Sequence, residues 1–357
     1  MFVQNPNTNR YRCLSFLLAG MMAVTSLPLP AFAADAAAGE EIAISAERFP
    51  DEQFRNYISE QLDSDGDNML SATECSEVVD LNVSQQGIAD LTGIDVFSKL
   101  QQLDCSGNTL SALDISGAAQ LLQLNCSANP DLSALKLPEK NGAFSFLVML
   151  DCSDCALTEL SLDSYALLGT LDCSVNQLAA LDISANSNLR TVDCSGNQLT
   201  ELDVYNALLQ KLDCSENALP SLFLSECSAL RELDCSQNQL VELDTTGLTL
   251  EILETAGNQR AIVPQPERAG AYSYDLNNLP ELEQDRITGW ENASVKEDAA
   301  NVLQIPADTE HVAYGYRLDS QQAVPVATFT LTLQPDEACY LQLREIPFPL
   351  QWTEPIN

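Results

Sequence analysis

Seven cysteines recur along the chain at a nearly constant spacing, in phrases such as TVDCSGNQLTELDVY. Six of them follow an aspartate and one follows Asn125. They are Cys105, Cys126, Cys152, Cys173, Cys194, Cys214 and Cys235. Thiols and carboxylates at a regular interval allow four interpretations: a metal site, a reactive thiol, a disulfide framework, or a structural position that is filled by cysteine.

The spacing of these cysteines favours a repeat architecture. The interval is 20 or 21 residues with one gap of 26, and a repeat of this length is typical of a solenoid. The shared unit L-x-x-L-D-C-S-x-N-x-L-x-x-L-D fits the leucine-rich repeat pattern, with cysteine in the third apolar position. We therefore predict a leucine-rich repeat solenoid over residues 79–262, with a parallel β-sheet on its concave face.

Side-chain alternation within each strand assigns a role to the cysteine. Leu212 and Cys214 are expected to face inward together, while Asp213 and Ser215 face the concave surface. The cysteines then form a buried ladder of small apolar side chains. Zinc needs thiolates that converge on one point, whereas ladder neighbours lie in a row about 4.8 Å apart. Parallel Cβ directions in a packed ladder also disfavour disulfides between neighbours.

The outward-facing acidic residues are the candidate partner-binding surface, called the aspartate column below. They are Asp104, Asp151, Asp172, Asp193, Asp213 and Asp234. Carboxylates one strand spacing apart repel each other by roughly 1 kcal/mol in water and attract cations, so the column suits ions or a basic partner. A solvating stripe that discourages aggregation of the sheet is the alternative. The neighbouring concave positions supply none of the aromatic anchors that dominate protein-binding hot spots.

A second stretch with metal-binding chemistry precedes the repeats. An amphipathic helix is expected to begin at Pro50 and end at Leu62, and DSDGDNMLSATE then forms a twelve-residue loop. Oxygen donors in this order suit calcium, in the manner of an EF-hand. The predicted ligands are Asp63, Asp65, Asp67, the carbonyl of Met69, Ser71 and Glu74. The alternative is an acidic turn before a capping box formed by Ser71 and Glu74.

Two details of this loop depart from the usual calcium-binding pattern. Asn68 stands where such loops usually carry glycine, and asparagine tolerates a left-handed conformation better than most residues do. The sequence contains no second loop of the same kind, so we expect the hand to be unpaired.

The two ends of the chain differ from the repeats. Arg10 and Arg12 precede an apolar stretch that ends in a small-x-small site at Ala33, which predicts a signal peptide over residues 1–33 and export of the mature chain. Residues 34–78 are expected to form a helical cap that carries the calcium loop. After Val263 the repeats stop, and short alternating runs predict a β-rich cap domain and tail over residues 263–357.

Composition narrows the possible partners and the possible chemistry. The 52 acidic and 16 basic residues give a formal charge of −36, which repels nucleic acids and anionic lipids. The apolar run near the N-terminus is short and broken by prolines, so membrane insertion is not expected. A regular ladder gives each aspartate a similar environment, whereas hydrolysis needs two differently tuned carboxylates. His311 is the only histidine, and it has no evident catalytic partners. The sequence therefore does not predict an enzyme.

Taken together, these motifs resemble those of a known group of proteins. The LDCSxNxL coils resemble bacterial secreted leucine-rich repeat proteins of the internalin-like kind, and FPDEQFRNYISEQLDSDGDNMLS is similar to segments in exported proteins of gut-type anaerobic bacteria. The calcium loop resembles one half of a dockerin. This resemblance implies an extracellular or surface-held protein that mediates recognition or adhesion. The alternative is a structural spacer of the cell surface, whose concave face binds no specific ligand.

Overall fold

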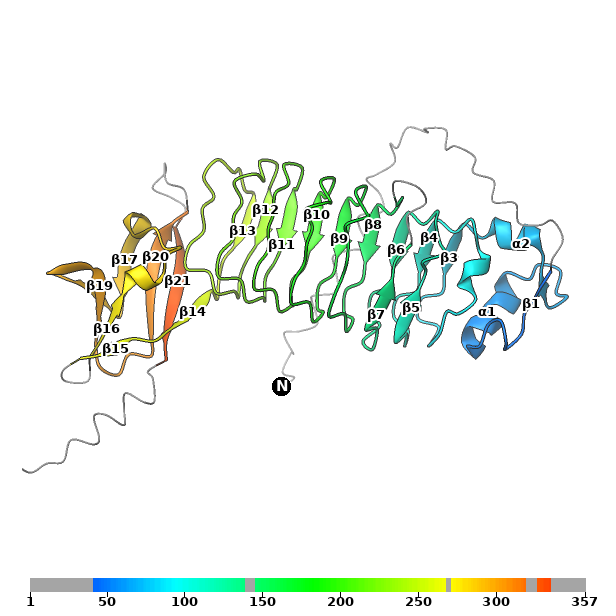
Figure 1. Ribbon diagram of the computed structural model, residues 1–357, viewed down its shortest axis with the longest axis horizontal. Helices are drawn as coiled ribbons and strands as arrows, with labels where there is room; N and C mark the ends of the chain where they lie inside the picture. The colour runs from blue at the N-terminus through cyan, green and yellow to red at the C-terminus, as the bar shows by residue number, and fades with distance from the viewer. Residues whose placement is uncertain (1–40, 139–144, 268–270, 319–325, 335–357) are drawn as a thin grey trace, which may run out of the picture. The chain divides into compact units, whose positions relative to one another are not determined.

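The computed structural model describes residues 41–138, 145–267, 271–318 and 326–334 (Figure 1). Within these residues the repeats form a leucine-rich repeat solenoid whose coils contribute nine strands to one parallel sheet. The strands are β3 (Asp80–Asn82), β4 (Gln102–Asp104), β6 (Gln123–Asn125), β8 (Met149–Asp151), β9 (Thr170–Asp172), β10 (Thr191–Asp193), β11 (Lys211–Asp213), β12 (Glu232–Asp234) and β13 (Ile252–Glu254). The predicted signal peptide lies outside the described residues and stays a prediction.

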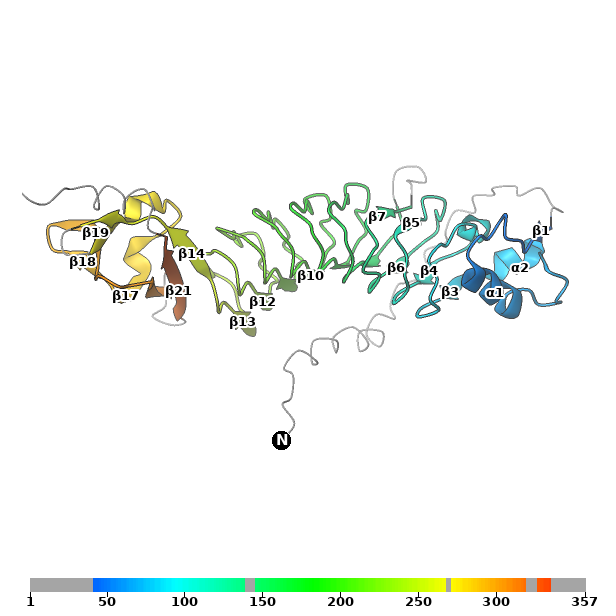
Figure 2. The same cartoon turned by 90° about the horizontal axis from the view of Figure 1, so that it is seen from below.

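Every strand of this sheet lies beside the strand of the next coil, in register. Asp193 pairs with Asp172 on one side and with Asp213 on the other. Two further strands, β5 (Ala112–Asp114) and β7 (Ala134–Lys136), form a separate parallel pair on the opposite side of the coils (Figure 2). Each coil therefore has a sheet side and a return side, and the core lies between them.

The solenoid core consists of the inward residues that the repeat pattern predicts. The central leucine or valine of the sheet strands β4, β6 and β8 to β12 is at most 2% exposed, and all seven ladder cysteines are 0% exposed. Leu212 and Cys214 are buried, whereas Asp213 on the same strand is partly exposed. The predicted inward positions are therefore confirmed, whereas Ser215, which was expected to face the concave surface, is buried.

The strands are short because the chain turns sharply after each Asp-Cys-Ser. The residue three positions after the strand aspartate, or its equivalent, has a positive φ in every coil from Gly107 to Gly257. Glycine fills this position in some coils, while Val175 (φ 53°) and Glu216 (φ 55°) fill it in others. Because only glycine adopts this conformation without steric cost, the non-glycine coils carry local strain.

The N-terminal cap comprises β1 (Ile42–Ala43), α1 (Glu52–Gln61), β2 (Met69–Leu70) and α2 (Ala72–Glu77). Helix α1 ends with Leu62 as its C-cap, as the sequence predicts, but its N-cap is Asp51 and Pro50 precedes it. The Asp51 side chain accepts from the backbone N–H of Phe54 and also from that of Ala89. One carboxylate thus caps the helix and ties it to the first coil.

The C-terminal region contains two four-stranded sheets within the described residues. One comprises β14 (Gln259–Ile262), β21 (Val326–Leu333), β20 (His311–Arg317) and β17 (Ile287–Glu291), and the other comprises β15 (Gln265–Pro266), β16 (Tyr272–Asp275), β19 (Ala299–Ile305) and β18 (Ser294–Lys296). Short 3-10 turns occur at Ile94–Val96, Leu276–Asn278 and Gln284–Arg286. β14 pairs with β21 in parallel, and the other pairings are antiparallel. None of the helices in the described ranges has the length and apolar character to cross a bilayer.

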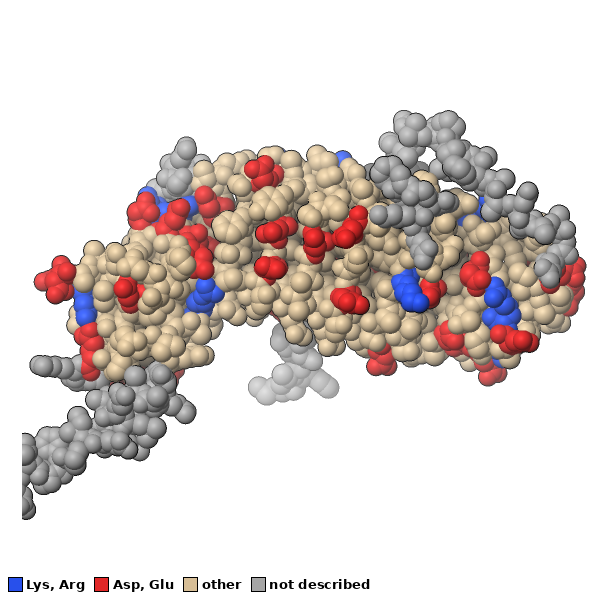
Figure 3. Space-filling view, in the orientation of Figure 1, with Lys and Arg blue, Asp and Glu red and all other residues tan. Residues whose placement is uncertain are grey.

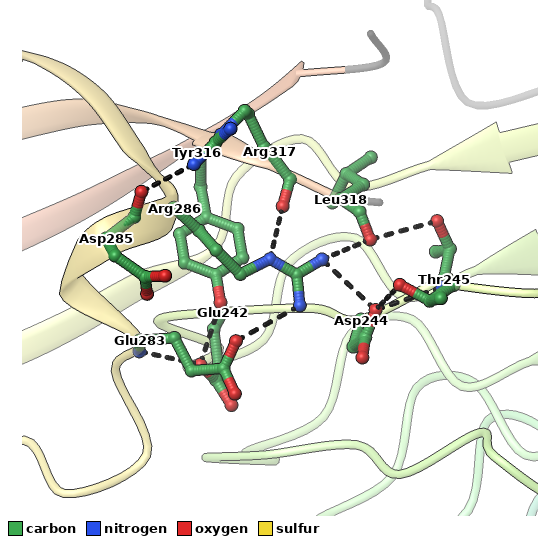
Figure 4. Close-up of polar contacts among 10 residues, drawn as sticks. Glu242, Asp244, Thr245, Glu283, Asp285, Arg286, Tyr316, Arg317 and Leu318 are labelled. Atoms are coloured by element: carbon green, nitrogen blue, oxygen red, sulfur yellow. Dashed lines mark hydrogen bonds and ion pairs between the residues drawn. The ribbon is translucent and has the colours of Figure 1, made fainter. Parts of the chain in front are cut away.

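A buried arginine joins this region to the last coils (Figure 4). Arg286 is 3% exposed, and its guanidinium lies 5.1 Å from the centre of the Tyr316 ring. It donates to Asp244 of the solenoid at 3.1 Å and to the carbonyl of Leu318 at 2.5 Å. The Tyr316 hydroxyl donates in turn to Glu242 at 2.9 Å. A buried cation is costly without partners, so these contacts make the junction specific.

Candidate functional site

The structure places the six aspartates of the aspartate column in one row on the outer side of the sheet. Parallel register stacks them: Asp151 pairs with Asp172, and Asp213 pairs with Asp234. Two of them differ from the solvated stripe expected from the sequence, because Asp151 is 5% and Asp172 is 7% exposed, whereas the other four are partly exposed. The neighbouring coils cover these short side chains, which a sequence pattern does not show.

A hydrogen bond to the next serine explains how these carboxylates are held. Oδ1 of Asp193 accepts from the backbone N–H of Ser195 at 3.0 Å and from its hydroxyl at 2.7 Å. Asn125 makes the same pair of contacts with Ser127, at 3.1 and 2.7 Å. The equivalent serine N–H contacts of the other column aspartates measure 2.9–3.1 Å. Each residue of the column therefore closes the turn that follows its own strand.

Stacking and burial change the acidity of the column. Burial, together with the neighbouring charge of Asp151, raises the pKa of Asp172 to about 6. Burial and the charge of Asp193 raise the pKa of Asp213 to about 6 as well. The serine hydrogen bonds act in the opposite direction, but they do not outweigh desolvation. At neutral pH the ionised column therefore lowers the stability of the folded state, because burial and neighbouring carboxylates disfavour the charge.

The ladder cysteines have the properties of core residues. All seven are buried free thiols, and Cys194 donates weakly to the carbonyl of Asp213 in the next coil, with Sγ 3.5 Å from the oxygen. Burial and the adjacent carboxylates raise the pKa of Cys194 well above its usual value. A thiol in this state is a poor nucleophile and a poor metal ligand, so the structural interpretation is supported. Cys339 lies outside the described residues.

A ladder of asparagines accompanies the cysteines, as the repeat pattern predicts. The Asn197 side chain donates to the carbonyls of Cys173 and Cys194, and its Oδ1 accepts from the backbone N–H of Leu178. One coil has Cys155 in the asparagine position, and its thiol lies within 3.5 Å of the Cys126 carbonyl. Cysteine therefore replaces the asparagine donor and stays buried.

The predicted calcium ligands lie together only in part. One carboxylate oxygen from each of Asp63, Asp65 and Asp67 lies within 4.8 Å of the others. Glu74 is occupied by hydrogen bonds: one oxygen accepts from the N–H and hydroxyl of Ser64, and the other accepts from those of Ser71. These bonds lower the pKa of Glu74 to about 2. The capping box that the sequence offered as an alternative is therefore present.

The backbone of the loop is that of a tight acidic turn. Asn68 has φ 62°, as its position in the loop predicts, and Asp63 accepts from its N–H. Strand β2, at the loop's seventh and eighth positions, pairs with β1 through Ile42 and Leu70. The short strand β1 is a feature that the sequence did not reveal, since two residues are too few for a recognisable pattern. It gives the single loop a strand partner.

Charge is distributed over the surface as well as along the column. Figure 3 shows acidic side chains spread over one face of the molecule, with fewer lysines and arginines among them. Lys211 lies 3.6 Å from Glu232 across neighbouring strands, and both side chains are about two-fifths exposed. Such exposed pairs contribute little to stability, so the surface keeps its acidic character.

The fold and these ladders define the class of protein, which is a leucine-rich repeat protein. Among solved structures, the chain is similar to the functional domain of InlJ from Listeria monocytogenes, which is described as including a cysteine ladder. The identity is 18%, the match covers 83% of this chain and 99% of that chain, and the TM-score is 0.28. No protein-family model and no curated protein matches the chain.

Two further solved structures show the same kind of likeness. Internalin C2 from Listeria monocytogenes is 17% identical, with coverage of 60% of this chain and 97% of that chain and a TM-score of 0.48. YopM from Yersinia enterocolitica is 26% identical, with coverage of 51% and 42% and a TM-score of 0.38. At these TM-scores the likeness does not extend to the ligands of those proteins.

Proposed function

We propose that the chain is an exported, non-enzymatic leucine-rich repeat protein that binds a protein or peptide partner outside the cell or at its surface. The observation that carries the proposal is the stacking of the aspartate column by in-register strands, on a chain with 52 acidic and 16 basic residues. A row of carboxylates with raised pKa values is stabilised when a cation approaches it. A basic partner supplies such cations and a phosphate backbone does not.

We further propose that one calcium ion stabilises the N-terminal cap. Asp63, Asp65 and Asp67 present clustered hard oxygens, and Met69, Ser71 and Glu74 follow at the remaining ligand positions of the loop. Glu74 would exchange its hydrogen bonds with Ser64 and Ser71 for the ion. When bound, calcium would supply the positive charge that these carboxylates otherwise lack. Helix α1 and the capping box of α2 flank the loop, so the ion would hold these two helices together.

A paired substitution tests the partner-binding proposal. Asp193→Asn with Asp213→Asn removes two charges and keeps the serine contacts, as Asn125 does in its own coil. We expect a partner isolated from the native surroundings to bind this variant at least about tenfold more weakly, with less salt dependence. Asp131→Asn, an exposed acid outside the column, is the matched control and should bind like the wild type. Unchanged binding by the paired variant would contradict a role for the column.

One observation favours the spacer alternative. Every column residue also closes its own turn through serine, so the column has a structural role that requires no partner. Under this alternative the paired variant binds everything that the wild type binds, and only its stability changes. The same experiment therefore separates the two functions.

A further inference from the structure

The repeat provides an internal comparison for the outward positions on the return side of the coils. In three coils, an aspartate stands ten residues after the aspartate of the strand, and a serine or threonine stands twelve residues after it. These pairs are Asp114 with Ser116, Asp182 with Ser184, and Asp244 with Thr246. In each pair, Oδ1 of the aspartate accepts from the backbone N–H of its partner at 2.9–3.1 Å. The pair is thus a repeated device that closes the turn on the return side.

Four coils between β4 and β12 lack this pair, and in two of them, which are adjacent, an aromatic residue replaces one member. Tyr205 stands in the serine position after Asp203, and Phe223 stands in the aspartate position before Ser225. These coils are neighbours because their strands β10 and β11 pair in register. Tyr205 is 63% and Phe223 is 61% exposed, which are the highest values among the exposed large hydrophobic side chains of the described residues.

The packing of the core does not explain why Tyr205 and Phe223 occupy these positions. A ring that is more than half exposed buries little apolar area, and each ring occupies a position where a turn-closing residue stands in other coils. The two substitutions therefore lose local hydrogen bonds without a matching gain in the core. Exposed aromatic pairs of this kind are characteristic of binding surfaces, where burial of the rings by a partner supplies the missing free energy.

The charges around the rings indicate the chemistry of the partner. The return segments 180–189, 200–209 and 221–230 contain four acidic residues and neither lysine nor arginine. The acids are Asp182, Glu201, Asp203 and Glu226, and all four are exposed. A second copy of this chain would bring the same negative charges against them, so self-association is disfavoured. A partner segment in which apolar residues are flanked by lysine or arginine complements both the two rings and the four exposed carboxylates around them.

We propose that Tyr205 and Phe223, called the aromatic patch, anchor a basic and apolar segment of a partner protein. The proposal rests on the proposed function, in that the chain binds proteins, and it adds a surface on the side of the coils away from the aspartate column. The rings supply apolar contact at the centre, and the surrounding carboxylates set the charge preference.

Substitutions that restore the repeat test the patch without disturbing the fold. Tyr205→Ser places a serine after Asp203, and Phe223→Asp places an aspartate before Ser225. We expect each variant to melt at the same temperature as the wild type or above it, because the turn-closing hydrogen bond becomes available again. The binding probe is a labelled synthetic peptide in which lysine alternates with leucine and tryptophan, followed by fluorescence anisotropy. Each variant should bind this peptide at least about tenfold more weakly than the wild type does.

Matched controls distinguish binding at the aromatic patch from non-specific binding of the peptide. Ile252 is 50% exposed on β13, and its register partner is Glu232, so Ile252→Ser removes an exposed apolar side chain on the sheet side without changing the charge there. This control should bind the peptide like the wild type. A peptide with serine in place of leucine and tryptophan should lose binding, and one with glutamate in place of lysine should lose it too.

Several outcomes would overturn the patch. Equal peptide binding by the wild type and both patch variants is one, and binding that persists in the serine-substituted peptide is another. Self-association lost in the variants would indicate a second copy as the occupant, and glycan binding lost in them would indicate a sugar. If Asp193→Asn with Asp213→Asn abolishes peptide binding while both patch variants bind normally, the proposed function stands and the patch does not.

Discussion

Each Asp-Cys pair places a thiol and a carboxylate on opposite sides of one strand. The thiol of Cys194 fills the core and donates to the next coil, while Asp193 accepts from Ser195 and closes the turn. The pairing of these two residue types therefore follows from two separate structural needs. The cost is electrostatic, because parallel register brings each carboxylate next to another of the same charge.

This cost predicts how stability depends on pH. The pKa values of Asp172 and Asp213 are raised to about 6, so the folded protein holds these protons more tightly than the unfolded chain does. Their contribution to the free energy of unfolding is therefore fully present below about pH 4 and is lost as pH rises through about 6. The pKa of Glu74 is lowered to about 2, so its contribution is lost below pH 4. Denaturant unfolding between pH 3 and pH 8 should show a maximum near pH 4.

Asp172→Asn checks that the column causes this pH dependence. Asparagine keeps the contacts to serine, as Asn125 shows, and removes the buried charge. We expect the free energy of unfolding at pH 7.5 to rise by about 1–2 kcal/mol, since one pKa unit corresponds to about 1.4 kcal/mol. At pH 4 the same substitution should have little effect. A loss of stability at pH 7.5 would mean that the charge of Asp172 is stabilising.

At the scale of the coil, the left-handed turn after each strand carries testable strain. Val175 is β-branched, 55% exposed and held at φ 53°, whereas Gly196 occupies the same position in the next coil. Val175→Gly should raise the free energy of unfolding by about 1 kcal/mol, because relief of the left-handed strain exceeds the entropy cost of glycine. The reciprocal change, Gly196→Val, should lower it. Denaturant melts of the two variants that move in the same direction would contradict this account.

At the N-terminal cap, calcium should stabilise the protein. Addition of calcium after treatment with a chelator should raise the melting temperature, because an ion selective for the folded state stabilises it. Asp65→Asn with Asp67→Asn should remove most of this rise, and these residues are preferable to Glu74, which also forms the capping box. Asp213→Asn, in the aspartate column, should leave the calcium response unchanged. A rise that survives in the loop variant and disappears in Asp213→Asn would move the metal site to the column.

Sequence periodicity was sufficient for the solenoid and for the cap helix, because both depend on local patterns. The inward positions of Leu212 and Cys214 followed from alternation, and the end of α1 at Leu62 followed from its apolar face. The burial of Asp172 did not follow, since it depends on how closely adjacent coils cover a short side chain. Strand β1 was also missed, because two residues carry no pattern of their own.

For the molecule as a whole, the sequence predicted a β-rich C-terminal region and the structure adds how it contacts the repeats. Arg286 reaches Asp244 across 42 residues of sequence, and Tyr314 donates to the carbonyl of Val241. These contacts are long-range, so no repeat pattern encodes them. They anchor the last coils to the C-terminal sheets.

The recurring cysteines are structural residues of the solenoid core, and the proposed function does not use their thiols. Alkylation of the protein, read by mass spectrometry, tests this claim directly. All seven ladder cysteines should resist iodoacetamide in the folded protein, because they are 0% exposed and their pKa values are raised by burial. All seven should react once denaturant is added without reductant. Labelling of any of them in the folded state, or disulfides among them after denaturation, would contradict the account.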